Sequence, residues 1–431
     1  MTSPPNGSSP SAKDPAVPAV ARGRAAAMPF IMLTVLIDMV AVGLIIPVLP
    51  HLVGSFTDSA THKTLWFGVV AFSFGIANFF GSPVIGALSD RFGRRPVLLL
   101  GFCGLALSFF GTALAGALWV LIVVRLFGGA MQANAAVAHA YVADISAPDE
   151  RARRFGLIGA MFGLGFIIGP ALGGVLGSID LQLPFWVAGG LAVVNWFYGW
   201  LVLPESLPPE KRRPFDWKRV NPVASLAGLA RLHGVGWLVV VIGLSGLAQF
   251  TLHMTWVLYV DQKFGWGPRE TGWSLFAVGL MSALVQGVLL GRLLKRFSPR
   301  KLAVGGLVSS TLAYLAWGLA TEGWMMYAVI GANVLGFAGA SAIQSIVSNA
   351  ADEHTQGQAM GAVAGLNSLM AVVAPIVGPS LLALVSHLPK GDWRIGVPYY
   401  FCALLQAMAT VLAIHHFRTH RAAPAPAAAG S

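Results

Sequence analysis

The feature that most constrains this chain is a series of twelve apolar runs, each about as long as a membrane-spanning helix. A span needs about 20 mostly apolar residues, because the hydrocarbon core is about 30 Å thick and a helix rises about 1.5 Å per residue. Apolar residues make up 56% of the 431 residues and charged residues only 10%, whereas a soluble domain carries about 25% charge. The sequence therefore predicts an all-α integral membrane protein with twelve transmembrane helices. The runs lie near 29–50, 65–88, 97–116, 118–142, 155–178, 184–203, 235–260, 272–294, 302–320, 323–348, 359–386 and 395–417.

The placement of the basic residues predicts how these spans are oriented. Lys and Arg collect in the cytoplasmic loops of membrane proteins, and 22 of the 28 fall in the two termini and in every second loop, against five in the intervening loops. We therefore expect a multi-pass protein of the cell inner membrane, surrounded by lipid, with both termini in the cytoplasm. Because the charge is spread over six segments, the net charge of +11 does not indicate a nucleic-acid partner.

One long polar connection divides the chain into two sets of six spans. It is rich in proline, and we expect a cytoplasmic central loop there. Both ends of the chain are rich in Pro, Ser and Ala, and no apolar segment of a signal peptide precedes the first span, so we expect disordered tails rather than a signal peptide. The predicted domains are a tail at 1–27, an N-terminal bundle at 28–203, the loop at 204–234, a C-terminal bundle at 235–417 and a tail at 418–431.

The two sets of spans also repeat each other. Gly169-Pro170 in the fifth span recurs as Gly378-Pro379 in the eleventh. Since six spans return a chain to the same side of the membrane, the repeat implies two pseudo-symmetric six-helix bundles related by an axis along the membrane normal. Such halves are typical of transporters that hold their substrate between them, near the midplane.

Two charged residues, Asp38 and Arg125, fall within the hydrocarbon part of the predicted spans. A charge at mid-helix costs about 3 kcal/mol or more, so its presence there points to a function. Asp38 lies about 14 Å into the first span by the helix rise, where burial disfavours the ionised carboxylate. We interpret Asp38 as a proton carrier and Arg125 as a residue that modulates it and is a candidate ion-pair partner. A purely structural role for either residue is the alternative.

Polar residues recur at helical spacing on otherwise apolar spans and predict a substrate cavity. In the fourth span Arg125, Gln132 and His139 fall on one stripe, which must face the bundle interior or water. The second half supplies amides, hydroxyls and aromatic rings, which suit a broad amphipathic organic ligand. Any one of these residues could instead join helices by hydrogen bonds. The predicted cavity residues are Gln132, His139, Gln249, His253, Trp256, Ser282, Gln286, Asn333, Gln344 and Asn367.

Three motifs occur in order among the spans. They read Gly86-Ala-Leu-Ser-Asp90-Arg91-Phe-Gly93-Arg94-Arg95-Pro96 after the second span, Arg125-Leu-Phe-Gly-Gly129 in the fourth, and Gly165-Phe-Ile-Ile-Gly169-Pro170-Ala-Leu-Gly173-Gly174 in the fifth. Gly86 permits a close helix contact, and Asp90 can pair with Arg94. Together the motifs resemble the major facilitator superfamily, and the fifth-span pattern resembles that of its drug–proton antiporters.

The first span narrows the resemblance. Its stretch Asp38-Met-Val-Ala-Val-Gly43-Leu-Ile-Ile-Pro47-Val-Leu-Pro50 is similar to the tetracycline-efflux transporters of that superfamily. The resemblance implies a cytoplasmic gating network of Gly86, Asp90, Arg94 and Asp144, and a tightly packed antiporter helix through Gly165, Gly169, Pro170, Gly173 and Gly174. Where that group has ionisable residues, this chain has Ser108, Ser282 and Ser310, which argues against recognition of a metal–tetracycline cation.

The expected function is proton-coupled efflux of a small amphipathic drug, tetracycline or a related compound, by alternating access. Proton-driven or facilitated uptake of a small nutrient on the same fold is the alternative, and a receptor or scaffold without transport is a third hypothesis. An enzyme is not expected, because the sequence contains no metal-ligand cluster, phosphate-cradling loop or nucleophile–base pattern. Two cysteines, Cys103 and Cys402, exclude a disulfide framework. We expect a monomer whose partners are the drug and protons, without a cofactor or metal.

Overall fold

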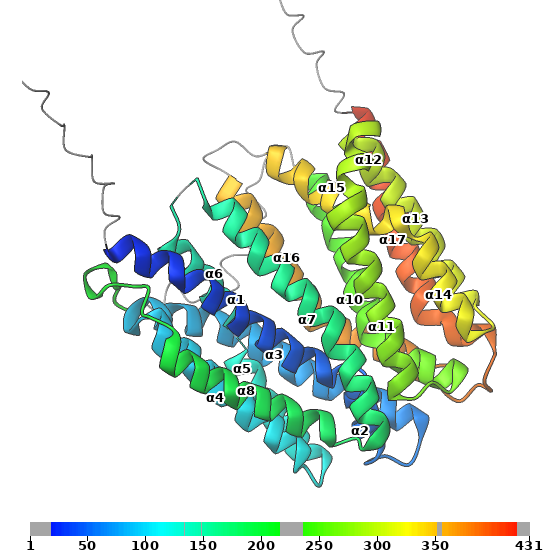
Figure 1. The fold of residues 1–431 in the computed structure, drawn as a ribbon. Helices are drawn as coiled ribbons and strands as arrows, with labels where there is room; N and C mark the ends of the chain where they lie inside the picture. The colour runs from blue at the N-terminus through cyan, green and yellow to red at the C-terminus, as the bar shows by residue number, and fades with distance from the viewer. Residues whose placement is uncertain (1–18, 133, 148, 216–235, 351–355, 420–431) are drawn as a thin grey trace, which may run out of the picture.

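The computed structural model describes residues 19–132, 134–147, 149–215, 236–350 and 356–419 (Figure 1). Within these ranges, eleven helices are long and apolar enough to cross a membrane, and a bent pair of helices supplies a twelfth span. Each span lies on one of the predicted runs, so the all-α membrane fold with twelve spans is confirmed. Most of the predicted tails and of the central loop lies outside the described residues, although the first helix already begins at Ala19.

The N-terminal half contains the first six spans. Local signals start some of its helices: Ser59 accepts a hydrogen bond from the backbone N–H of His62 (3.2 Å), and a proline opens α8, where its missing N–H has no cost. The helices are α1 (Ala19–Ile45), α2 (Leu49–Gly54), α3 (Ala60–Phe92), α4 (Arg94–Ala113), α5 (Leu118–Met131), α6 (Asn134–Ile145), α7 (Arg151–Ile179) and α8 (Leu183–Val202), followed by the short helix η1 (Pro209–Lys211).

The C-terminal half contains the other six spans. Prolines open α11 and α13 in the same way, and one turn of π-helix interrupts the eighth span. The helices are α10 (Gly236–Phe264), α11 (Pro268–Leu284), η4 (Val285–Leu289), α12 (Leu290–Arg296), α13 (Pro299–Leu319), α14 (Gly323–Ala332), α15 (Val334–Ala350), α16 (Gln356–Ala383), η5 (Trp393–Gly396) and α17 (Val397–Thr419).

One span in each half is broken near its middle. The fourth span is α5 followed by α6. The tenth span is α14 followed by α15, and these two helices meet at a bend of 48°. A buried asparagine lies at each break. Asn134 fits against Gly101, where a Cβ would lie 1.9 Å from its side-chain oxygen, and Asn333 accepts a hydrogen bond from Ser309 (2.9 Å). Broken spans are tolerated where polar side chains and neighbouring helices satisfy the freed groups, and the sequence analysis did not predict these breaks.

Glycines of α7 bring three helices into close contact. A Cβ at Gly165, Gly169 or Gly173 would come within 2.0 to 2.6 Å of an atom of α1. Gly174 faces the other way, where its Cβ would lie 2.9 Å from Gly272 in α11. The helix therefore packs on α1 within its own half and on α11 of the other half, with the small-residue contacts that membrane helices use. Pro170 lies within the same stretch of α7.

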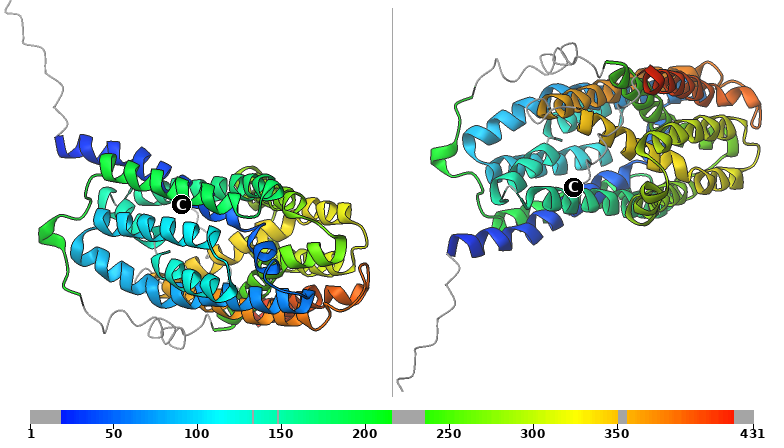
Figure 2. Two further views of the ribbon diagram at one scale, coloured as in Figure 1. Left: turned by 90° about the horizontal axis from the view of Figure 1, so that it is seen from below. Right: turned by 90° about the horizontal axis from the view of Figure 1, so that it is seen from above.

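The eleventh span, α16, makes the corresponding contacts for the second half. Gly378 lies against Thr251 of α10, while Pro375 and Pro379 lie against Gly68 of α3. Each half thus places its fifth helix against the other half. Figure 2 shows the two bundles side by side in two further views.

The contacts between the halves gather at the end of the molecule opposite the central loop. Lys63 at the start of α3 forms a salt bridge with Asp261 near the end of α10, and Thr61 shares a hydrogen bond with Ser386 (2.6 Å). The bundles converge near α2 and the start of α11 and diverge toward the start of α1 and the end of α17 (Figure 1). This conformation is therefore closed at one end and open at the end that holds the central loop.

The close helix contact expected at Gly86 does not form. Among the described residues, no atom outside its own surroundings in the helix lies within 4 Å of the position that a Cβ of Gly86 would take. The close approach of α3 occurs one and a half turns earlier, where a Cβ at Gly81 would lie 2.8 Å from the carbonyl of Ala130. The expectation was wrong because the space beside Gly86 is open in this conformation.

Candidate functional site

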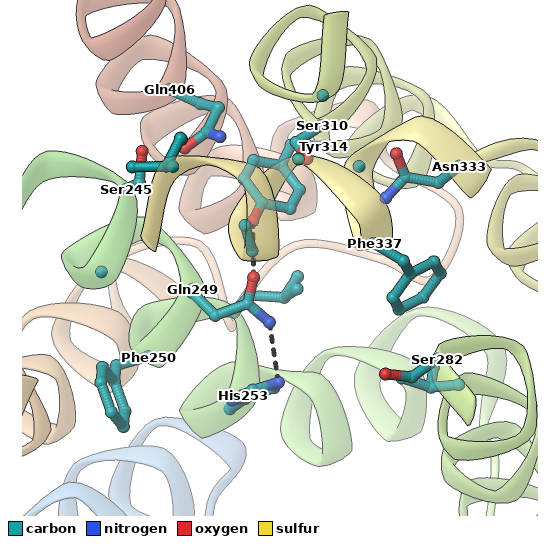
Figure 3. A pocket seen from close by; sticks show the side chains of 18 of the residues that line it. Ser245, Gln249, Phe250, His253, Ser282, Ser310, Tyr314, Asn333, Phe337 and Gln406 are labelled. Carbon is teal, nitrogen blue, oxygen red and sulfur yellow. Dashed lines mark hydrogen bonds between the residues drawn. The ribbon is translucent and has the colours of Figure 1, made fainter. Parts of the chain in front are cut away.

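One part of the candidate site is a cavity of about 490 Å³, lined mainly by α10, α11, η4, α13, α15, α16 and α17 of the C-terminal half and also by Phe166 of α7. This volume lies within the range of about 300 to 1,000 Å³ typical of small-molecule sites. Eight of the ten predicted cavity residues line it, and Figure 3 shows several of them pointing into one space. They are Gln249, His253, Trp256, Ser282, Gln286, Asn333, Gln344 and Asn367.

Hydrogen bonds orient the polar groups of this cavity. Tyr314 Oη donates to Gln249 Oε1 (3.2 Å), and Gln249 Nε2 lies 3.0 Å from His253 Nε2 (Figure 3). Gln286 Nε2 donates to Ser282 Oγ (2.6 Å). These amides, hydroxyls and the imidazole lie among aromatic rings, an arrangement that suits a ligand with an apolar body and several polar substituents.

Trp256 contributes an aromatic ring to the cavity, as expected. Its indole N–H donates to Ser274 Oγ (2.9 Å), and its ring packs edge-on against Trp317 with ring centroids 5.2 Å apart. Because its only polar group is already paired, Trp256 offers the cavity an apolar wall.

A second cavity, of about 570 Å³, lies between the two halves. Residues of α1, α3 and α5 form one wall, and residues of α10 and α16 form the other. Phe250 and His253 border both cavities, so the two adjoin and together form a central space. Of the described residues that line this space, Arg125 is the only Lys, Arg, Asp or Glu.

Arg125 is only 3% exposed. Its Nη2 donates to Thr112 Oγ1 (3.3 Å), and the rings of Phe74 and Phe185 each lie 6.0 Å from its guanidinium carbon. Within the described ranges, Nε has no hydrogen-bond partner. The expected ion pair with Asp38 is absent from the described residues, because the two side chains face different spaces.

Asp38 lies in a separate pocket of about 10 Å³ inside the N-terminal half, bounded by α1, α4, α6 and α7. It is 5% exposed, and Asn134 Nδ2 donates to its Oδ1 at 3.5 Å. The side chains of Phe102 and Phe162 border the same pocket. The carboxyl group is thus shielded by protein on all sides, and it borders neither of the two large cavities.

Two predicted cavity residues, Gln132 and His139, lie outside both cavities. Gln132 forms the break between α5 and α6. His139, beyond the break, packs against Phe155 and Phe162 of α7, with ring centroids 5.6 and 6.0 Å away. The predicted polar stripe required an unbroken helix. Because the span is broken, Arg125 borders the central space while His139 packs against α7. The prediction that Gln132 and His139 line the cavity was therefore wrong.

The three serines at positions where the resembled group has ionisable residues divide between two environments. Ser282 and Ser310 line the C-terminal cavity. Ser108 instead lies between α4 and α5, where its hydroxyl donates to the carbonyl of Val124 (3.2 Å) and Gly128 makes room for it. Only two of the three positions therefore border the central space.

A charged network occupies the open end of the N-terminal half. Arg94 pairs with Asp90 (2.6 Å, Nη1 to Oδ1) and with Asp144 (3.0 Å, Nε to Oδ2). Glu205 accepts hydrogen bonds from the backbone N–H groups of Arg94 (2.9 Å) and Arg95 (3.3 Å) and so caps α4, where a carboxylate is favourable. The network joins α3, α4, α6 and the segment after α8, and all these elements belong to one half.

The sequence analysis missed several residues of the central space. Some of them lie at helical spacing from one another or from a serine singled out in the sequence: Asn78 and Ser82 are four residues apart in α3, and Tyr314 follows Ser310 by four. That spacing is the signal that could have identified them. The missed residues include Phe74, Asn78, Ser82, Phe250, Tyr314 and Gln406. Glu205 was missed because it is distant in sequence from the helix that it caps.

Comparison with known proteins gives a consistent result. The Major Facilitator Superfamily profile matches residues 31–260 and 238–430. The tetracycline resistance protein of class C from Escherichia coli is 35% identical over 375 residues, which cover 86% of this chain and 93% of that protein. The class D protein from Salmonella ordonez is 32% identical over 387 residues, 88% of this chain and 96% of that protein.

Among solved structures, the human organic anion transporter MFSD10 (TETRAN) has a TM-score of 0.65 at 24% identity, over 90% of this chain and 99% of that chain. At that identity the likeness shows the fold alone. With twelve spans in two repeated bundles around a central space, and with a family match over nearly the whole sequence, this chain belongs to the major facilitator superfamily of membrane transporters.

Proposed function

We propose that this protein exports a small amphipathic drug across the cell inner membrane in exchange for protons. The observation that carries the proposal is the central space lined by amides, hydroxyls and aromatic rings, in a chain whose relatives are tetracycline resistance proteins. The structure supports a passage between the halves, and the relatives support a drug as the cargo.

Transport proceeds by alternating access. With both termini in the cytoplasm, as the basic residues predict, the open end of this conformation faces the cytoplasm. The drug enters there, and the two bundles rock about the contacts of α7 with α11 and of α3 with α16, which open the other end. The network of Asp90, Arg94 and Asp144 lies where the halves meet when the cytoplasmic end closes, so we assign it to gating.

Asp38 carries the proton in this scheme. Its contact with Asn134 lies directly after the break in the fourth span, and Arg125 lies on the other side of that break. Protonation removes the negative charge that accepts the Asn134 hydrogen bond, so it changes how α6 is held against α1. The coupling of Arg125 to Asp38 is then indirect, through the broken helix. A proton moving inward down 100 mV supplies about 2.3 kcal/mol.

The test is drug flux in everted membrane vesicles that carry the wild type or Asp38→Asn. We expect the wild type to accumulate drug when a proton gradient is imposed, and Asp38→Asn to lose that accumulation while it is still inserted in the membrane. Asp58→Asn, which changes an exposed carboxylate in a loop, is the matched control. Equal gradient-driven export by Asp38→Asn would remove the carrier assignment, and flux in the opposite direction would favour uptake.

A resistance profile identifies the drug. A bacterial host that lacks its own pumps is transformed with the full chain and challenged with a panel that includes tetracycline. Protection against tetracycline would match the names of the relatives. Protection against another compound only would mean that Ser282 and Ser310 are the better guide to the substrate.

A further inference from the structure

The central space contains a buried cation that has no counter-ion among the described residues. Arg125 borders the cavity between the halves, and among the described residues its only hydrogen bond goes to the neutral hydroxyl of Thr112, while Nε has no partner. A buried charge is expensive unless an opposite charge or several hydrogen bonds compensate it. The weak attraction of the Phe74 and Phe185 rings, each at 6.0 Å, compensates only part of that cost.

The acidic residues of the described chain do not supply this counter-ion. Neither cavity is lined by an Asp or Glu among the described residues. Asp38 is the acid that the sequence places within the membrane interior, and it lies in its own pocket with Asn134. The central space therefore has a positive electrostatic character, set by one guanidinium group, and the remaining polar groups are amides, hydroxyls and an imidazole.

We propose that the substrate is an amphipathic organic anion whose acidic group binds to Arg125. This inference rests on the proposed function and names its substrate class. A carboxylate, sulfonate or enolate has the geometry to accept hydrogen bonds from the guanidinium group. The apolar body of the ligand then lies against Phe67, Phe74 and Phe79 of the same wall, and its neutral polar substituents reach Gln249 in the adjoining cavity.

The test measures binding of three fluorescent probes that share one dansyl group. They are dansylglycine, an anion; its methyl amide, which is neutral; and dansylcadaverine, a cation. The full chain is purified into lipid nanodiscs, and each Kd is measured by fluorescence anisotropy. We expect the anion to bind about tenfold more tightly than the neutral probe, the ratio that corresponds to about 1.4 kcal/mol, and the cation to bind most weakly.

Three variants assign this preference to a residue. Arg125→Gln removes the positive charge and should bring the ratio of the two Kd values close to one. Asn78→Asp keeps the shape of a side chain that lines the same cavity and accepts a hydrogen bond from Ser82, but it adds a negative charge and should reduce the ratio as well. Lys263→Gln is the matched control, because Lys263 is a buried cation that donates to the carbonyl of Gly318 (2.8 Å) and borders neither cavity; its ratio should stay that of the wild type.

The outcomes separate this inference from the proposed function. Equal binding of the anionic and neutral probes by the wild type would overturn the inference, as would a preference that survives in both Arg125→Gln and Asn78→Asp. If vesicles export drug but the protein in nanodiscs shows no anion preference, only the proposed substrate class is refuted. If the anion preference is present and vesicles export nothing, the proposed function falls and the anion site stands.

Discussion

Breaking the salt bridge between Lys63 and Asp261 is expected to shift the transporter away from the conformation described above. The pair joins α3 of the first half to α10 of the second at the closed end, beside the hydrogen bond between Thr61 and Ser386. When that end opens, the two helices must separate. The salt bridge therefore stabilises only the conformation in which this end is closed, and its loss should increase the population of the other conformation.

The exposure of the two side chains sets the size of the shift. They are 19% and 31% exposed, so water screens the attraction, and such pairs contribute about 0.2 to 1 kcal/mol. Since each 1.4 kcal/mol corresponds to about tenfold in an equilibrium constant, the ratio of the two conformations should change by a factor of about 1.4 to 5. Lys63→Met is the informative variant, because it removes the charge and keeps most of the aliphatic chain that packs on Gly54.

The assay measures distances between spin labels across the closed end. Cysteines replace the exposed residues Asp58 in the first half and His387 in the second, in a variant without the two native cysteines. Lys63→Met should enlarge the fraction of long distances, and the charge exchange Lys63→Asp with Asp261→Lys should partly reverse it. An unchanged distance distribution in Lys63→Met would refute the reasoning.

The matched control breaks a salt bridge that does not join the halves. Arg394 and Asp392 lie at the same end but both belong to the second half, and they are 2.7 Å apart. Their hydrogen bonds hold the pKa of Asp392 below its usual value. Asp392→Asn should leave the distance distribution unchanged. A shift as large as that of Lys63→Met would mean that surface charge, rather than the link between the halves, sets the equilibrium.

Two further predictions concern packing and capping. Gly173→Val should lower the thermal unfolding midpoint, because a Cβ there would already lie 2.0 Å from the carbonyl oxygen of Leu44 and overpacking costs about 1 to 3 kcal/mol. The control is Gly159→Val on the same helix, where no described atom outside the adjacent helix backbone lies within 4 Å of the Cβ position. Equal losses in the two variants would contradict the packing argument. Glu205→Gln should destabilise the protein by about 0.5 to 2 kcal/mol through loss of the α4 cap, measured by the same unfolding assay against Glu210→Gln; no difference between the two would exclude Glu205 as a cap.

The sequence by itself determined the twelve spans and the repeated bundles. A membrane helix satisfies its own backbone hydrogen bonds and must be apolar along about 20 residues. A local stretch of sequence is therefore enough to predict it. One ion pair of Arg94 was also predicted from a local stretch of sequence, since Asp90 lies only four residues before it in the motif. Eight of the residues that line the C-terminal cavity were also predicted from the sequence, because an unbroken helix such as α10 keeps its polar positions on one face.

Only the tertiary structure decided how the two membrane charges are used. The fourth span is interrupted at Gln132, and Arg125 and His139, on either side of the interruption, do not share a face. Asp38 and Arg125 consequently occupy different spaces, and the cavity is left with one cation and no carboxylate among the described residues that line it. Hydropathy determines whether a segment enters the membrane, but the side on which each of its residues lies depends on contacts between helices that are far apart in the chain.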